Sequence, residues 1–136
     1  NNEFPNFLAQ FIHNSFDKKN KKNFLILGLT FKENVSDLRN TKVIDLICSL
    51  EKFGHKIDVN DNFADVNEAK KIGIGLTTLN KKKKYDSIIL AVAHNDYKKL
   101  NYSFFQKKIK KDGKIFDLKG IWNKKRFLGK IEYIHL

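Results

Sequence analysis

Several residue types are rare in the sequence, and each shortage excludes some classes of protein. Its 136 residues include one cysteine, one proline, one tryptophan and no methionine. A single cysteine excludes an internal disulfide framework and is typical of a reducing compartment. The longest apolar runs are about six residues, whereas a membrane span needs about twenty, and no signal-peptide pattern opens the chain. We therefore expect no membrane span and a cytoplasmic location.

Arginine is also scarce, although the chain is strongly basic. The formal net charge is +12, and only Arg39 and Arg126 are arginines among the 27 basic residues. Specific readers of bases favour arginine, because its planar fork makes paired hydrogen bonds. The lysines form short scattered runs, which favour a solvated basic surface and no specific nucleic-acid partner. Salt-sensitive polyanion binding and a structural assembly module stay open as alternatives.

A regular alternation of patterns predicts the fold. An amphipathic helix is expected at residues 4–16, with a polar linker after it, and Pro5 suits its first turn. Apolar runs typical of strands then alternate with helical patterns, and the expected strands cover residues 24–29, 56–60, 87–93, 114–118 and 131–136. The sequence thus predicts the α/β class: a three-layer, mainly parallel Rossmann-like sheet with helices on both faces, preceded by one amphipathic helix.

Three helices are expected between these strands, at residues 43–53, 64–71 and 97–111. Gly54 ends the first of them, and Asn40 or Thr41 is placed to cap its beginning. Cys48 falls on the apolar stripe of that helix, so we expect it to be a small buried residue and not a nucleophile.

Cationic residues follow the predicted strands where a parallel sheet would bind a ligand. Lys32 and Arg39 follow the first strand, close to a helix N-terminus that favours anions, and Lys119 follows the 114–118 strand. Because carboxyl ends of parallel strands share one edge, this set predicts a phosphate or nucleotide pocket. Surface pairing of Lys32 and Arg39 with neighbouring acids is the alternative.

Other candidate residues carry weaker signals. His94, at a strand end, is expected to be a hydrogen-bonded structural histidine, and Trp122 a packing residue. Gly73 and Gly75 form a G-x-G without a third glycine or a strand–turn–helix context. The four histidines lie about forty residues apart without cysteine or carboxylate partners at ligand spacing, so no metal site is expected.

Several motifs together resemble one family. Residues 27–34 read L-G-L-T-F-K-E-N, residues 37–43 read D-L-R-N-T-K-V, and V-N-D, Y-D-S-I-I-L-A-V-A-H and F-D-L-K-G follow in order at 59–61, 85–94 and 116–120. The run is similar to the C-terminal, UDP-sugar-binding domain of the UDP-glucose/GDP-mannose dehydrogenase family. The resemblance covers residues 23–136, and residues 1–22 are similar to the end of the family's central linking and dimerisation helix with its linker.

The resemblance implies an activity for the parent protein. It would be an oxidoreductase that oxidises C6 of a nucleotide sugar from alcohol to carboxylate in two NAD-dependent steps, forming a uronic acid for cell-surface polysaccharide, and it would be a homo-oligomer. The family's NAD-binding domain and catalytic cysteine lie upstream, and Cys48 does not correspond to that cysteine. We therefore expect this chain alone to be inactive, with no catalytic, cofactor-binding or metal-binding residue.

The resemblance also implies roles for four residues. Phe31 and Lys32 would contact the bound UDP-sugar, Arg39 would lie in the loop that supports it, and Lys119 stands where many members carry an arginine that reaches the ligand. Lys119 followed by Gly-Ile looks more like the branch that oxidises UDP-N-acetylhexosamines than the UDP-glucose branch. Asn62 replaces a common proline without touching the pocket.

Overall fold

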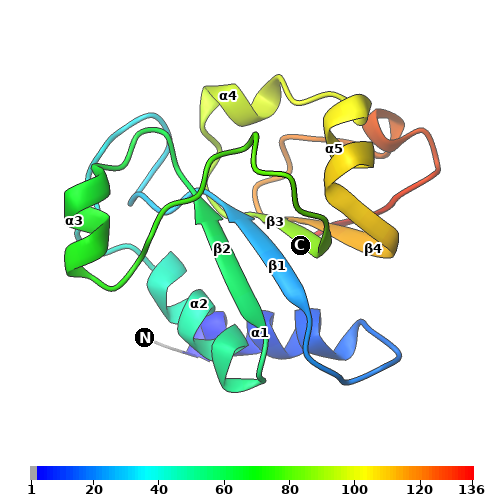
Figure 1. Cartoon of the computed structure of the whole chain (residues 1–136), viewed down its shortest axis with the longest axis horizontal. Coiled ribbons are helices and arrows are strands. Elements are labelled where there is room, and N and C mark those ends of the chain that lie inside the picture. The colour runs from blue at the N-terminus through cyan, green and yellow to red at the C-terminus, as the bar shows by residue number, and fades with distance from the viewer. Residues whose placement is uncertain (1–2) are drawn as a thin grey trace.

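The apolar runs of the sequence become strands in the computed structural model, which describes residues 3–136. The strands are β1 (Asn23–Leu27), β2 (Lys56–Asn60), β3 (Tyr85–Leu90), β4 (Ile109–Asp117) and β5 (Glu132–His135). The helices are α1 (Glu3–Asn14), α2 (Val43–Lys52), α3 (Val66–Lys71), α4 (Asn95–Lys98) and α5 (Tyr102–Lys108), with a 3-10 helix, η1, at Lys124–Phe127 (Figure 1).

All five strands are parallel and lie in the order β2-β1-β3-β4-β5. The chain passes from β1 to β2 on one side and then returns to β3 on the other, so the order reverses between β1 and β3. Ligands of open α/β sheets bind outside the carboxyl ends of the strands at such a reversal. The predicted parallel α/β fold is confirmed, and the loops after β1 and β3 are where a site is expected.

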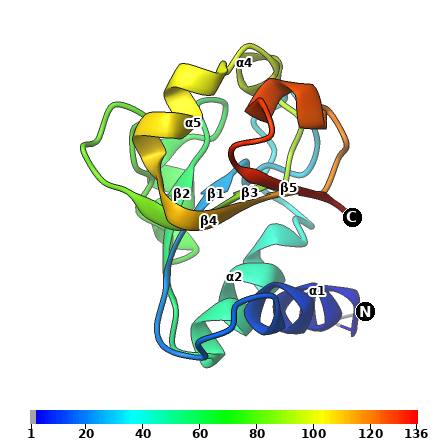
Figure 2. The ribbon, with the colours of Figure 1, turned by 90° about the vertical axis from the view of Figure 1, so that its right-hand side faces the viewer.

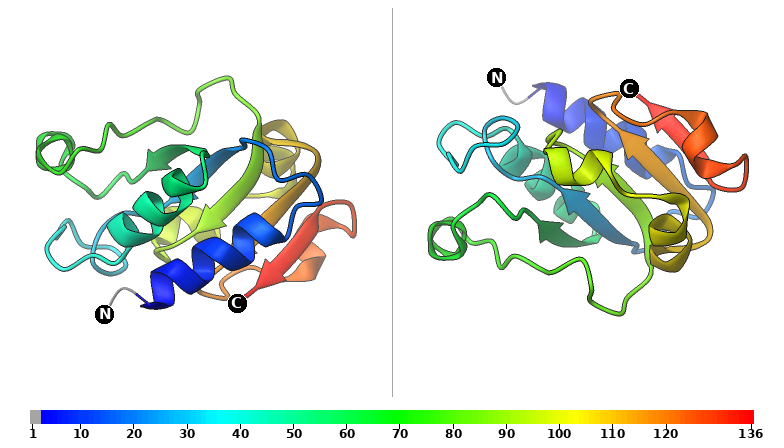
Figure 3. Two further views of the ribbon diagram at one scale, coloured as in Figure 1. Left: turned by 90° about the horizontal axis from the view of Figure 1, so that it is seen from below. Right: turned by 90° about the horizontal axis from the view of Figure 1, so that it is seen from above.

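Different helices cover the two faces of the sheet (Figure 2). Phe24 and Ile26 of β1 pack with α1 and α2, whereas Leu25 and Leu27 pack with α4, α5 and η1. Successive strand residues point to opposite faces, so a strand covered on both sides must be apolar throughout. Figure 3 shows α1 beside α2 under the strands, and α4 and α5 above them.

The predicted N-terminal helix is confirmed as α1, but its apolar residues divide into two sets. Leu8, Ala9 and Ile12 are buried against the sheet and α2. The other set remains exposed, at 68% for Phe4, 60% for Phe7 and 40% for Phe11. The apolar stripe of α1 is wider than its contact with the domain, so part of the stripe stays exposed as an outer apolar face.

A histidine pair ties α1 to the rest of the domain. His13 Nδ1 lies 2.9 Å from His55 Nε2, and the backbone N–H of Lys22 donates to His55 Nδ1 at 3.0 Å. Because an N–H only donates, His55 Nδ1 is the acceptor and its Nε2–H donates to His13. Phe53 stacks on the His13 ring, with centroids 4.2 Å apart.

The expectation of a buried Cys48 is wrong, because its side chain is exposed on α2. The face of α2 that packs on the core carries Val43, Leu46, Ile47 and Leu50. The N-terminal cap also differs in detail: Lys42 holds the cap position without a side-chain bond, and the Thr41 hydroxyl accepts from the Val43 N–H at 3.2 Å.

The single helix expected at residues 97–111 is also wrong, because three elements replace it. The chain forms α4, then α5, and enters β4 at Ile109, five residues before the expected strand. The break occurs at Asn101, whose side chain accepts from the Phe104 N–H at 3.0 Å and starts a new helix. Ile109 is extended and pairs with Tyr85, since burial between α5 and β3 outweighs its helical spacing.

Candidate functional site

The loop after β1, residues 28–42, starts with a backbone conformation that only glycine adopts readily. Gly28 has φ +102, and a Cβ at this position would lie 2.5 Å from the Cβ of Val92, just after β3. The Gly28 N–H donates to the Asn60 carbonyl at 2.8 Å. The close approach brings the chain past both neighbouring strands at the reversal point and directs the loop over the carboxyl edge of the sheet.

A buried carboxylate fixes the first residues of this loop. Asp61, directly after β2, is 3% exposed. Its Oδ2 accepts from the backbone N–H of Leu29 at 2.7 Å and of Thr30 at 3.0 Å. Its Oδ1 accepts two further backbone N–H groups, from residues 63 and 64. The side chain of a neighbouring strand thus sets the backbone path that leads to Phe31 and Lys32.

His94 completes this bracing and is fully buried. The Asn34 N–H donates to His94 Nδ1 at 2.8 Å, so the proton is on Nε2, which donates to Asp61 Oδ2 at 2.9 Å. Burial alone raises the pKa of Asp61, but hydrogen bonds from His94, Leu29 and Thr30 outweigh it and lower that pKa. The expectation of a hydrogen-bonded structural histidine is confirmed.

The three predicted site residues of this loop lie at its surface. Phe31 is 53% exposed and Lys32 is exposed. The Arg39 side chain, 87% exposed, forms a bidentate pair with Asp37, at 3.1 Å from Nε and 3.2 Å from Nη2. The hydrogen bond from Arg39 lowers the pKa of Asp37. Lys32 is thus an available cation, whereas Arg39 is partly neutralised within its own loop.

A second buried aspartate holds the loop that carries Lys119. Asp117, the last residue of β4, is fully buried. Its Oδ1 accepts from the backbone N–H groups of Lys119 at 3.0 Å and Gly120 at 2.7 Å. Its Oδ2 accepts from the Trp122 N–H, and the Trp122 indole donates to the Tyr97 carbonyl at 2.9 Å. The expectation that Trp122 packs in the core is confirmed.

Lys119 itself borders a small cavity of about 150 Å³ between the carboxyl edge and α1. Lys42, ahead of α2, also lines it, together with apolar side chains such as Leu46 and Leu118. The structure therefore joins Lys119 with Lys42, while Phe31, Lys32 and Arg39 lie along the same edge but outside the lining of this cavity. Sequence reasoning missed Lys42, whose only signal is its place just before a helix.

Sequence reasoning also assigned no role to Asp61 and Asp117, although both stand in motifs that resemble the family, at residues 59–61 and 116–120. Their signal is an aspartate at the carboxyl end of a strand, where an unpaired carboxylate would not be buried. Within residues 3–136 no cluster of three or more His, Cys, Asp or Glu residues is placed to hold a metal ion. Over the same range, every helix is too short or too polar to cross a bilayer.

The strand order and the braced loops at the carboxyl edge define a Rossmann-like α/β domain. A profile of the UDP-glucose/GDP-mannose dehydrogenase family, UDP binding domain, matches residues 25–124. The chain therefore belongs to the UDP-glucose/GDP-mannose dehydrogenase family and contains its UDP-binding domain, which confirms the resemblance noted in the sequence.

Proteins of similar sequence support the same assignment. Protein CapL of Staphylococcus aureus is 48% identical over 99 residues, which are 72% of this chain and 23% of that protein. A UDP-N-acetyl-D-glucosamine 6-dehydrogenase of Pseudomonas aeruginosa is 40% identical over 96 residues, 70% of this chain and 23% of its own length. The chain thus spans about a quarter of the length of these relatives.

Solved structures share the fold at low sequence identity. The UDP-N-acetyl-mannosamine dehydrogenase Cap5O from S. aureus matches with a TM-score of 0.78 and 19% identity, over 99% of this chain and 31% of that one. A UDP-D-ManNAc dehydrogenase from Pyrococcus horikoshii matches with a TM-score of 0.78 and 18% identity, also over 99% of this chain and 31% of that one. These matches include α1, so the helix and the sheet keep a common arrangement in the fold.

Proposed function

We propose that this chain is the substrate-binding part of an NAD-dependent nucleotide-sugar 6-dehydrogenase that acts on a UDP-N-acetylhexosamine and forms a uronic acid for cell-surface polysaccharide. The similarity to a UDP-N-acetyl-D-glucosamine 6-dehydrogenase supports this substrate class. The structural likeness to UDP-N-acetylmannosamine dehydrogenases is consistent with it. The parent protein would act in the cytoplasm as a homo-oligomer.

The observation that carries the proposal is the bracing of two lysine-bearing loops by buried aspartates. Asp61 fixes the backbone ahead of Lys32, and Asp117 fixes the backbone of Lys119. The ammonium groups of Lys32 and Lys119 supply positive charge for a diphosphate, and the fixed loops reduce the entropy lost on binding. Phe31 adds an exposed ring beside Lys32 for the ligand to contact.

Arg39 has a supporting role in this proposal. Its guanidinium binds Asp37 on both nitrogens of the fork, and the Phe31 N–H donates to the Asp37 carbonyl at 2.7 Å. Arg39 thus steadies the segment that returns to Phe31, and contact with the ligand falls to Phe31 and Lys32.

This chain does not fit NAD, so the cofactor would bind the remainder of the parent protein. Dinucleotide folds place the pyrophosphate on a tight glycine-rich turn that leads directly into a helix. Here residues 28–42 separate β1 from α2, and no second glycine occurs between Gly28 and Val43. Cys48 lies within α2, away from the carboxyl-edge loops, and we assign it no role in the reaction.

We further propose that residues 1–22 belong to a linking and dimerisation helix with its linker, and that residues 23–136 form the UDP-sugar-binding domain; residues 1–2 lie outside the described part. The exposed set of Phe4, Phe7 and Phe11 supports this division, because such a face is suited to contact with another part of a larger protein.

Thermal unfolding with UDP or UDP-N-acetylglucosamine tests the proposal. A ligand that binds only the folded state at a hundred times its Kd stabilises by about 2.7 kcal/mol and raises Tm. We expect Lys32→Ala to remove most of the rise and the exposed control Lys70→Ala, on α3, to retain it. Equal rises in both variants, or no rise at millimolar UDP, would contradict the proposal. Addition of NAD and the UDP-sugar to this chain should yield no NADH.

A further inference from the structure

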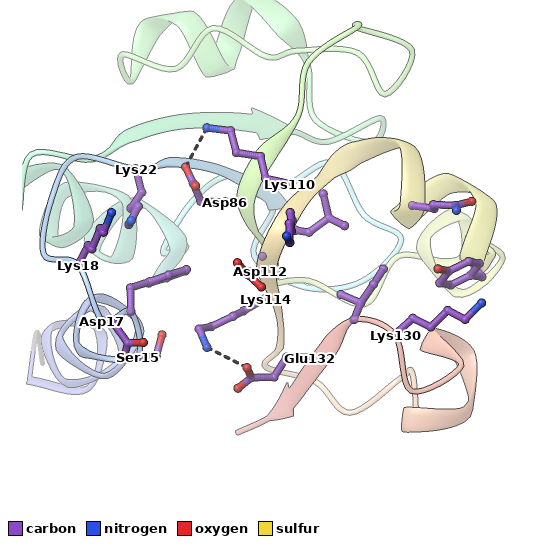
Figure 4. A pocket seen from close by; sticks show the side chains of 17 residues that line it. Ser15, Asp17, Lys18, Lys22, Asp86, Lys110, Asp112, Lys114, Lys130 and Glu132 are labelled. Atoms are coloured by element: carbon purple, nitrogen blue, oxygen red, sulfur yellow. Dashed lines mark hydrogen bonds and ion pairs between the residues drawn. The ribbon is translucent and has the colours of Figure 1, made fainter.

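A larger cavity lies at the other end of the sheet. It has a volume of about 840 Å³ and is formed where β1, β3, β4 and β5 begin (Figure 4). Residues 15–18 and Lys22 line one side, residues 109–114 the opposite side, and residues 130–132 a third side. We call it the amino-edge cavity. Because the strands are parallel, it is separated from Lys32 and Lys119 by the length of the sheet.

Lysines dominate the charges of the amino-edge cavity. Lysines 18, 22, 110, 111, 114 and 130 line it, against Asp17, Asp86, Asp112 and Glu132. Two of the acids are neutralised: Lys114 binds Glu132 at 2.8 Å, and Lys110 binds Asp86 at 3.4 Å (Figure 4). The other four lysines form no ion pair with the described residues and outnumber the remaining aspartates, Asp17 and Asp112, by two.

Two ammonium groups each lie near one buried ring at the wall of this cavity. Lys22 Nζ lies 5.3 Å and Lys114 Nζ 5.6 Å from the centroid of Phe16, which is 8% exposed. Glu132 neutralises Lys114 but not Lys22. The Lys22 ammonium therefore keeps its charge at the cavity wall, where a bound anion would be attracted to it.

An irregularity in the sheet places further cations at the cavity. Tyr85 pairs with Ile109 and Ser87 with Lys114, so residues 110–113 of β4 stand opposite the single residue Asp86 of β3. Asp112 in this excursion has φ +64. Bulges and left-handed non-glycine residues are concentrated at functional sites. This one displaces Lys110, Lys111 and Asp112 from the ladder to the cavity.

We propose that the amino-edge cavity binds a ligand with two or more linked phosphate groups, at a site separate from the UDP-sugar site. Its volume is within the roughly 300–1,000 Å³ of small-ligand sites. Its cations are lysines on flexible stems, which bind phosphate oxygens as point charges and adapt to a chain of phosphates. The proposal does not depend on the proposed function, because the two sites share no residue.

Calorimetric titration of residues 1–136 with inorganic tripolyphosphate at low ionic strength tests the site. We expect the triple variant Lys22→Gln, Lys111→Gln, Lys130→Gln to bind at least about tenfold more weakly, because each lost lysine removes charge-assisted hydrogen bonds. The matched control carries the same change at the exposed lysines 70, 124 and 125 and should bind within about twofold of the unaltered chain. Equal weakening in both triple variants would show diffuse attraction and overturn the proposal.

A variant of opposite sign sharpens the test. Asp112→Asn removes one of the two unpaired acids, and asparagine tolerates the positive φ, so we expect tripolyphosphate to bind about two- to threefold more tightly. Glu51→Gln, at an exposed site on α2, is the control and should change nothing. Unchanged or weaker binding by Asp112→Asn would contradict the proposal.

Two further arms identify where and what the chain binds. Lys32→Ala should leave tripolyphosphate binding intact; its loss there would move the anion to the carboxyl edge and overturn the proposal. A nucleoside triphosphate that binds more tightly than tripolyphosphate, and loses affinity in the cavity variant, would identify a nucleotide as the source of the phosphates. Equal affinities would identify the phosphate chain alone. Unliganded Tm values confirm that every variant folds.

Discussion

The two edges of the sheet hold their charged groups in different ways. At the carboxyl edge, Asp61 and Asp117 are buried and accept backbone N–H groups, while Lys32 and Lys119 remain exposed. At the amino edge, the carboxylates of Asp86 and Glu132 are partly exposed and bind lysine side chains. The first arrangement fixes whole loops of backbone through several N–H groups. At the second, Asp86 accepts one backbone N–H, from Asn23 at 2.8 Å, and the remaining contacts of Asp86 and Glu132 fix lysine side-chain ends.

This difference has consequences for stability and for binding. Hydrogen bonds to a buried carboxylate are strong and poorly screened, whereas exposed ion pairs contribute little and weaken with salt. We infer that the carboxyl edge is organised before a ligand arrives, and that the amino edge adapts to its ligand. Variants of equivalent acids at the two edges measure the contrast directly.

The largest effect is expected for Asp61→Asn. The asparagine has one oxygen and one NH2 group in place of two carboxylate oxygens. The NH2 group therefore faces either the N–H groups of Leu29 and Thr30 or those of residues 63 and 64, and these buried donors lose their acceptor. We expect a loss of about 3–5 kcal/mol in the free energy of unfolding, measured with urea. Asp86→Asn at the amino edge is the comparison. A loss below about 1 kcal/mol for Asp61→Asn would show that the loop is not braced as described.

Gly28→Ala should have the next largest effect. The new methyl group meets the Val92 Cβ at 2.5 Å in a conformation with φ +102, so both steric overlap and backbone strain oppose folding. We expect about 2–4 kcal/mol of destabilisation by urea unfolding. Gly129→Ala is the matched control, since its φ is +66 but no atom lies within 4 Å of the new Cβ; it should lose only about 1 kcal/mol. Equal losses would remove the close approach as the cause.

A smaller, pH-dependent effect is expected where α1 meets the sheet. Burial, with the charges of His13 and Lys22, lowers the pKa of His55 from 6.5 to about 4. The unfolded chain therefore takes up this proton first, so the stability is complete above pH 6.5 and declines as the pH falls towards 4. We expect His55 to account for about 1–2 kcal/mol of that decline, allowing for solvent screening.

Urea unfolding at pH 7.5 and 4.5 measures this contribution. In His55→Asn the side-chain oxygen still accepts from the Lys22 N–H but does not titrate, so the difference between the two pH values should shrink. His135→Asn, at an exposed position, should leave that difference unchanged. An identical pH dependence in the unaltered chain and His55→Asn would show that the histidine pair does not sense pH.

The sequence predicted the sheet well because strands buried on both faces must be apolar throughout. It predicted α2 less well, because apolar residues lie on more than one side of that helix, and only packing decides that Leu46 is buried and Cys48 exposed. Helical spacing also extended across Asn101 to Ile109, where pairing with β3 determines the conformation. Local patterns thus fail where a distant partner decides.

The same reasoning separates the two proposed sites. Lys32 and Lys119 can be proposed as ligand-binding residues from the sequence, because strand ends have a fixed place in a parallel sheet. The role of Asp61 cannot be predicted in this way, because its partners Leu29 and Thr30 lie about thirty residues away and no local pattern encodes the contact. The amino-edge cavity was also missed, since its lysines come from separate segments and were interpreted as a solvated surface.

Glu132→Gln should have the smallest effect on stability. The Lys114 ammonium is 2.8 Å from the Glu132 carboxylate; the Lys114 side chain is 16% exposed and that of Glu132 57%. The glutamine oxygen can still accept from the ammonium, and water reaches the exposed partner, so the change costs little. We expect a loss below about 1 kcal/mol, shrinking further in 0.5 M salt as screening weakens the pair (roughly a 4 Å Debye length). The freed Lys114 should also tighten tripolyphosphate binding. A loss that persists in high salt would mean that the amino edge is braced as firmly as the carboxyl edge, and the contrast between the two edges would fail.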